Sequence, residues 1–154
     1  MKTRFRLVQF LFCIHVTALA WAGSPVSWTF TTKPAHGDTV NVLATASCEE
    51  GWHIYALVLP SDLGPLPTEL RIPQDSDFTL VGAPTEPDPV EMDDPNFGVV
   101  VRFHPGTAIF QQALLRAGPA AFVVKGVVEY MACNDKTCLP PHAVPFTLDI
   151  PSAK

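Results

Sequence analysis

Apolar and polar residues alternate with a period of two along most of this chain, and short turns separate the alternating stretches. In the first stretch Val26, Trp28 and Phe30 alternate with serine and threonine, and residues 40–46 repeat the pattern. Side chains that alternate in this way line the two faces of a β-strand. The predicted strands are residues 26–31, 40–48, 52–56, 69–72, 78–81, 99–103, 107–117, 122–131 and 146–150.

Turn-forming residues set the lengths of these strands, because the chain contains sixteen prolines and nine glycines. Residues 107–117 also fit an amphipathic helix by the spacing of their apolar side chains, but Gly106 and Gly118 limit the segment to strand length, so we predict a strand. Many short strands between turns are typical of two packed antiparallel sheets. We therefore expect one all-β domain, an antiparallel β-sandwich.

The strand at residues 52–56 should have one face in the core. Trp52, Ile54 and Ala56 are predicted to point inward, with His53 and Tyr55 on the opposite face. A single histidine in a strand is more often structural than a ligand or a base, and we interpret His53 in that way.

The acidic stretch at residues 84–95 shows no alternation, so we predict a long surface loop there. Its acidic residues are Glu86, Asp88, Glu91, Asp93 and Asp94. Long loops in compact domains are usually functional or mobile, although an acidic loop that only aids solubility is the alternative. Phe97 follows in the turn from Asp94 to Gly98, where turn chemistry does not ensure that an aromatic side chain is buried.

The first 22 residues are predicted to be a signal peptide, not part of the domain. A basic start precedes an apolar run from Leu7 to Leu19, and small residues allow cleavage after Ala22. The basic residues are Lys2, Arg4 and Arg6. We therefore expect residues 23–154 to form one periplasmic domain, and we expect no membrane-spanning segment because the apolar run is too short.

The charge of the exported chain excludes one class of partner. Removal of residues 1–22 takes away three of the ten Lys and Arg residues and none of the fifteen Asp and Glu residues, so the net charge changes from −5 to −8. Binding to nucleic acid needs clustered basic side chains, so we do not expect a nucleic acid partner.

An odd number of cysteines remains after export: Cys48, Cys133 and Cys138. Cysteines in an oxidising compartment are normally paired or redox-active, so one of the three needs its own explanation. Cys48 continues the inward-facing row of the second strand, and we interpret it as a buried, inert thiol. A resolving or intermolecular cysteine is the alternative.

Cys133 and Cys138 allow three interpretations. A structural disulfide over so short a loop would add only about 2 kcal/mol through chain entropy. A copper or zinc site could use both sulfurs and His142, with Met131 or His53 nearby, but no methionine follows His142 as in blue-copper ligand loops. A redox-active pair would exchange disulfides by thiolate attack, which needs two close and accessible sulfurs at a position such as a strand end.

Several motifs follow one another in the order seen in one known family. They are Trp28, Gly51-Trp52-His53-Ile54-Tyr55, Gly64-Pro65-Leu66-Pro67-Thr68, the turn from Asp94 to Gly98, Val128-Glu129-Tyr130-Met131-Ala132-Cys133 and Cys138-Leu139-Pro140-Pro141. This order resembles the N-terminal periplasmic domain of the transmembrane thiol:disulfide interchange protein DsbD, also called the disulfide bond corrector domain. The resemblance covers nearly all of residues 23–154, and the segment from Tyr130 to Pro141 is its most specific part.

The resemblance implies an immunoglobulin-like sandwich with protein-disulfide reductase activity. Its catalytic pair, Cys133 and Cys138, would accept electrons from a membrane-embedded thiol-disulfide carrier and pass them to oxidised thioredoxin-fold proteins of the periplasm. Cys138 would be the sulfur that attacks a partner or is attacked by it. Tyr130, Asp94 and Phe97 would line and shield the pair, and neither a cofactor nor a metal is expected.

The chain also departs from the family pattern. One residue fewer separates Cys133 from Cys138 than in the best-studied member, so the loop should be tighter. Family members are usually fused to a membrane domain and a thioredoxin domain, and this sequence contains neither. We therefore expect that the partner is encoded separately or that the relay has been lost. A non-catalytic binding module with a structural disulfide and a copper chaperone remain as alternative functions.

Overall fold

The alternating stretches of the sequence become β-strands in the computed structural model, which describes residues 23–153. The predicted signal peptide lies outside the described residues. The strands are β1 (Val26–Pro34), β2 (Thr39–Cys48), β3 (His53–Tyr55), β4 (Glu69–Arg71), β5 (Phe78–Thr85), β6 (Val90–Asp94), β7 (Val99–Pro105), β8 (Thr107–Arg116), β9 (Phe122–Tyr130), β10 (Ala132–Cys133) and β11 (His142–Ile150).

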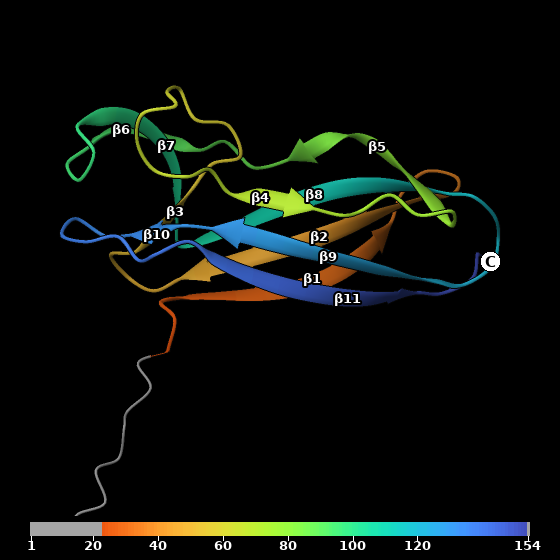
Figure 1. Ribbon diagram of the computed structural model, residues 1–154. Coiled ribbons are helices and arrows are strands. Elements are labelled where there is room, and N and C mark those ends of the chain that lie inside the picture. The colour runs from red at the N-terminus through yellow and green to blue at the C-terminus, as the bar shows by residue number, and fades with distance from the viewer. Residues whose placement is uncertain (1–22, 154) are drawn as a thin grey trace, which may run out of the picture.

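The strands form three antiparallel sheets in the described part of the chain. Their orders are β1-β2-β8-β5, β11-β9-β4 and β10-β3-β7-β6. The first two sheets pack face to face, with β1 against β11 at one side. The third sheet lies at the end of the sandwich opposite the C-terminus, where the β6–β7 turn and the loop after β10 project together (Figure 1).

The core follows the predicted alternation. Val40, Val42, Ala44 and Ala46 of β2 are all buried, as expected for the inward face. In β8 the buried residues also alternate, beginning with Ala108 and Phe110, so the strand prediction for this segment is confirmed. The all-β, single-domain prediction is therefore correct, and the architecture is an immunoglobulin-like β-sandwich.

The prediction of one long loop over residues 84–95 was wrong. β5 continues to Thr85, and residues 90–94 form β6, which pairs with β7. The alternation in β6 is limited to Val90 and Met92, because the next inward position carries a buried carboxylate, Asp94, in place of an apolar residue.

Both faces of β3 are buried, although only one was predicted to be. Ile54 is buried in the main apolar core and Ala56 is buried too, as expected, but His53 and Tyr55 on the opposite face are buried as well. They pack in a second apolar cluster, called here the small cluster, whose buried members are Tyr55, Val101, Phe103 and Cys133. In the described residues no helix is long and apolar enough to cross a membrane.

Candidate functional site

Cys133 and Cys138 form a disulfide that closes the loop after β10. β10 is held against β3, with Cys133 directly opposite His53. The amide of Asn134 donates to the carbonyl of Thr137 (2.9 Å), and the Asn134 side-chain oxygen accepts from the amides of Lys136 and Thr137 (2.9 Å each). These bonds fold residues 133–138, the cysteine loop, into a tight turn and keep its two ends close.

The two sulfurs differ in their access to solvent. Cys133 is fully buried in the small cluster, whereas Cys138 lies at its edge and is partly exposed. Thiol–disulfide exchange proceeds by attack of a thiolate on one sulfur of a disulfide, so the accessible sulfur is the one a partner can reach. Cys138 is therefore the more accessible residue of the pair, and Cys133 is the enclosed one.

Asp94 anchors the turn that neighbours the cysteine loop. Although Asp94 is only 2% exposed, its Oδ2 accepts from the Tyr55 hydroxyl (2.6 Å) and its Oδ1 from the Asn96 amide (2.7 Å). The Gly98 amide donates to the Asp94 carbonyl (2.7 Å) and closes the Asp94–Gly98 turn. A buried carboxylate held by several donors fixes the turn on the small cluster.

The hydrogen bonds also decide the charge of Asp94. Burial by itself would raise the pKa of this carboxyl, but the bonds from Tyr55 and from the amides of Asn96 and Phe97 outweigh it, so the pKa of Asp94 is lowered. Conversely, burial and the nearby carboxylate raise the pKa of Tyr55. The pair is therefore a neutral phenol that donates to an ionised carboxylate.

A pH dependence of stability follows from the lowered pKa of Asp94. This contribution is fully present above the unfolded-state pKa of about 3.9 and is lost as the pH falls from there through the lower folded value. We expect the unfolding free energy of the wild type to fall more steeply below about pH 4 than that of Asp94→Asn. Urea unfolding at a series of pH values measures this, and Asp93→Asn, with an exposed side chain, should follow the wild type.

The Asp94–Gly98 turn lies against the cysteine loop. The Asn96 side-chain amide donates to the carbonyl of Asn134 (3.1 Å), which joins the two loops that project together in Figure 1. Phe97 is 37% exposed and lies next to Gly64, where an added Cβ would stand 3.9 Å from the Phe97 Cβ. Of the predicted lining residues, Asp94 and the turn that carries Phe97 are thus beside the loop that contains the cysteines.

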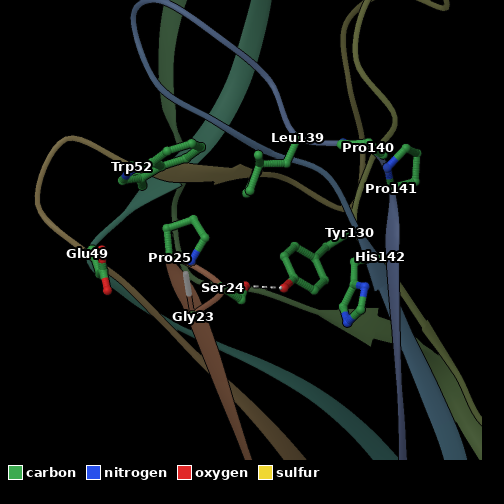
Figure 2. A pocket seen from close by; sticks show the side chains of 11 residues that line it. Gly23, Ser24, Pro25, Glu49, Trp52, Tyr130, Leu139, Pro140, Pro141 and His142 are labelled. Atoms are coloured by element: carbon green, nitrogen blue, oxygen red, sulfur yellow. Dashed lines mark hydrogen bonds between the residues drawn. The ribbon is translucent and has the colours of Figure 1, made fainter. Parts of the chain in front are cut away.

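Tyr130, the third predicted lining residue, belongs to the main core and not to the small cluster. It packs in the main core against Trp28 (ring centroids 5.3 Å apart), and its hydroxyl is hydrogen-bonded to that of Ser24 (3.2 Å). Tyr130 and His142 line a pocket of about 580 Å³ beside residues 139–141, which follow the cysteine loop. Figure 2 shows the two side chains next to each other in this pocket. The rest of the pocket wall includes Glu49, Trp52, Leu139, Pro140 and Pro141.

Sequence reasoning missed Tyr55 as the tyrosine of the site. Tyr55 shares the small cluster with Cys133 and holds Asp94. It lies two residues from His53, the cross-strand neighbour of Cys133, and so projects from the same face of the sheet. The sequence did show that His53 and Tyr55 are two residues apart and so share one face of a strand. That face could be assigned to the cysteine site only once the pairing of β3 with β10 was known.

Cys48 is a free, partly buried cysteine at the end of β2. Burial raises the pKa of its thiol to about 11, against a smaller opposite effect of a backbone hydrogen bond. Such a thiol is almost entirely protonated near neutral pH and is a poor nucleophile. Among the residues that the structure describes, no group of three or more His, Cys, Asp or Glu side chains is arranged to hold a metal ion.

Comparison with known proteins identifies the family of this chain. The sequence matches the family described as "Thiol:disulfide interchange protein DsbD, N-terminal" over residues 24–150. No curated protein shows a significant match. Among solved structures, the chain is similar to the N-terminal periplasmic domain of ScsB from Proteus mirabilis, with 16% identity, a TM-score of 0.57, and coverage of 84% of this chain and 49% of that one.

Two further solved structures show weaker similarity. The reduced DsbD N-terminal domain of Neisseria meningitidis is 22% identical with a TM-score of 0.45, covering 79% of this chain and 90% of that one. The GAE domain of GGA2p from Saccharomyces cerevisiae is 17% identical with a TM-score of 0.46, covering 82% and 92%. The chain spans about half the length of the ScsB domain. Because the family match extends over most of the sequence, the chain belongs to the DsbD N-terminal family of thiol–disulfide interchange domains.

Proposed function

We propose that this domain is a periplasmic protein-disulfide reductase that relays reducing equivalents through Cys133 and Cys138. A membrane thiol–disulfide carrier would reduce the pair, and the reduced pair would then reduce thioredoxin-fold proteins of the periplasm. The observation that carries the proposal is the disulfide with one buried and one accessible sulfur, placed beside an anchored turn. The family match and the predicted signal peptide support the same function and location.

The different access to the two sulfurs favours a division of labour. Cys138 forms the mixed disulfide with a partner, and Cys133 resolves it by attacking Cys138 from the inside. In the opposite direction a partner thiolate attacks Cys138, and Cys133 leaves. The Asp94–Gly98 turn would move aside for the partner, because it lies on the cysteine loop and its contact to Asn134 is one exposed hydrogen bond.

A trapping experiment tests this function. Cys133→Ala leaves Cys138 without its resolving partner, so we expect it to accumulate mixed disulfides with purified periplasmic thioredoxin-fold proteins, visible on non-reducing gels. Cys138→Ala leaves only the buried sulfur and should trap at least about tenfold less, because a buried thiol reacts slowly. The double variant is the control. The relay would be disproved if neither single variant captured a partner and if the wild-type disulfide resisted every periplasmic donor.

A further inference from the structure

His53 is the cross-strand neighbour of the buried sulfur. It lies directly opposite Cys133 in the β3–β10 ladder, and directly opposed residues project from the same face of a sheet. Its ring packs edge-on against Tyr55 (centroids 5.3 Å apart) and against Phe103 (4.8 Å), which are both members of the small cluster. His53 and Cys133 therefore share one apolar compartment.

One nitrogen of His53 has no partner. The side chain is 7% exposed, and its Nε2 is closed off from solvent without a hydrogen bond. A buried, unpaired polar atom is costly and needs an explanation. Two of the neighbouring polar groups are already engaged with each other, because the Tyr55 hydroxyl donates to one oxygen of Asp94 and the Asn96 amide donates to the other.

The cysteine pair carries a hydrogen that it can donate only in its reduced state. In the disulfide neither sulfur carries a hydrogen, whereas opening of the disulfide leaves Cys133 as a thiol or thiolate that is fully buried. A buried thiolate without a partner is strongly disfavoured, and bulk water cannot take the proton directly from a sulfur with no exposure. The resolving step thus needs an internal proton acceptor.

We propose that His53 is this acceptor: Nε2 accepts a hydrogen bond from the Cys133 thiol in the dithiol state and takes its proton when Cys133 becomes a nucleophile. The inference rests on the relay function proposed above. It gives His53 a chemical role in place of the structural one expected from the sequence.

The step balances as an ordinary dithiol–disulfide exchange. The Cys138 thiolate attacks one sulfur of the partner disulfide, forms a mixed disulfide and releases the other partner sulfur as a thiolate. The Cys133 thiol then gives its proton to His53 and attacks the Cys138 sulfur. The Cys133–Cys138 bond forms, the bond from Cys138 to the partner breaks, and its electron pair leaves on the partner sulfur. Two thiols are oxidised and one partner disulfide is reduced.

The surroundings favour the neutral form of His53, whose ring has a free lone pair, and they offer an exit for a proton. Burial lowers the pKa of His53, and the charges of Asp94 and Asp135 oppose that effect only in part. Tyr55 faces the ring from β3, Asp94 from the end of β6 and Asp135 from the cysteine loop. His53 also borders a hollow of about 380 Å³ whose rim includes Glu49, Glu50 and Asp135. A proton taken up by His53 can leave through this acidic hollow.

Exchange with oxidised glutathione tests the role of His53. The reduced protein is mixed with oxidised glutathione and quenched by acid, and mass spectrometry follows the formation and loss of the Cys138–glutathione disulfide. His53→Phe keeps the aromatic packing but removes the acceptor, so we expect the intermediate to persist at least about tenfold longer than in the wild type. His36→Phe, an equal change at an exposed histidine in the turn between β1 and β2, should leave its lifetime unchanged.

A second measurement uses the wild type and does not depend on the variant folding. The imidazole ¹⁵N shift of His53 Nε2 should change on reduction to that of a hydrogen-bonded acceptor, and in Cys133→Ala it should not change under the same conditions. An unchanged shift in the wild type, or an intermediate that resolves equally fast in His53→Phe, would overturn the inference. If wild-type Cys138 formed no mixed disulfide at all, the relay itself would have failed.

Discussion

Asp94→Ala should destabilise the oxidised protein by about 3 kcal/mol, because hydrogen bonds to a charged group contribute about 1.5–3 kcal/mol each and their donors would lose the acceptor. The Tyr55 hydroxyl would be left buried without a partner, and the Asn96 amide would lose its bond. Urea unfolding of the oxidised protein at neutral pH measures the loss.

The same change should open the site. With its anchor removed, the Asp94–Gly98 turn no longer holds its position against the cysteine loop, so we expect dithiothreitol to reduce the Cys133–Cys138 disulfide faster than in the wild type. Tyr55→Phe removes one of the bonds and should cost about 1 kcal/mol, the value of a typical hydrogen bond. Asp93→Ala, at an exposed position of the same strand, should change neither quantity. Equal reduction rates in Asp94→Ala and wild type would show that the turn does not control access.

The strand faces that could be assigned correctly belong to strands in which one face meets the core and the other meets water. β1 and β2 have this environment, and apolar residues recur at every second position along most of their length. β3 does not, because the main core covers Ile54 and the small cluster covers Tyr55. A strand buried on both faces carries no polar alternation to read, so its role in building the site was hidden.

Closeness in the sequence did not decide which side chains lie near Cys133. Tyr130 lies three residues before Cys133, an odd separation, and the two side chains enter different clusters. Tyr55 is far away in sequence but shares a face with Cys133 because β3 pairs with β10. Asp94 was identified from the motif, but its burial and its bond to Tyr55 depend on β6 pairing with β7, a strand that acidic residues concealed. Register, and not composition, decided these contacts.

Gly126→Ala should be among the most destabilising single changes in this domain, with an expected cost of about 3 kcal/mol, at the upper end of the usual range for overpacking. A Cβ on Gly126 would lie 2.4 Å from Cζ of Phe146 and 2.9 Å from the carbonyl oxygen of Arg71. The ring has little room to retreat because it stacks on Phe30 (centroids 4.4 Å apart), and the carbonyl belongs to the backbone of β4.

The damage should reach the redox site as well, because Gly126 lies in β9, which leads into β10 and Cys133. A shift of β9 away from β4 and β11 would be passed along the strand, so we expect the disulfide of Gly126→Ala to be reduced faster than that of the wild type. Gly118→Ala is the matched control, since a Cβ there would meet no atom within 4 Å. Thermal and urea unfolding measure the stability of both alanine variants. If both were as stable as the wild type, Phe146 would have to move freely to make room for the new Cβ. The close packing of β9 under the Phe146 ring would then not support the cysteine loop.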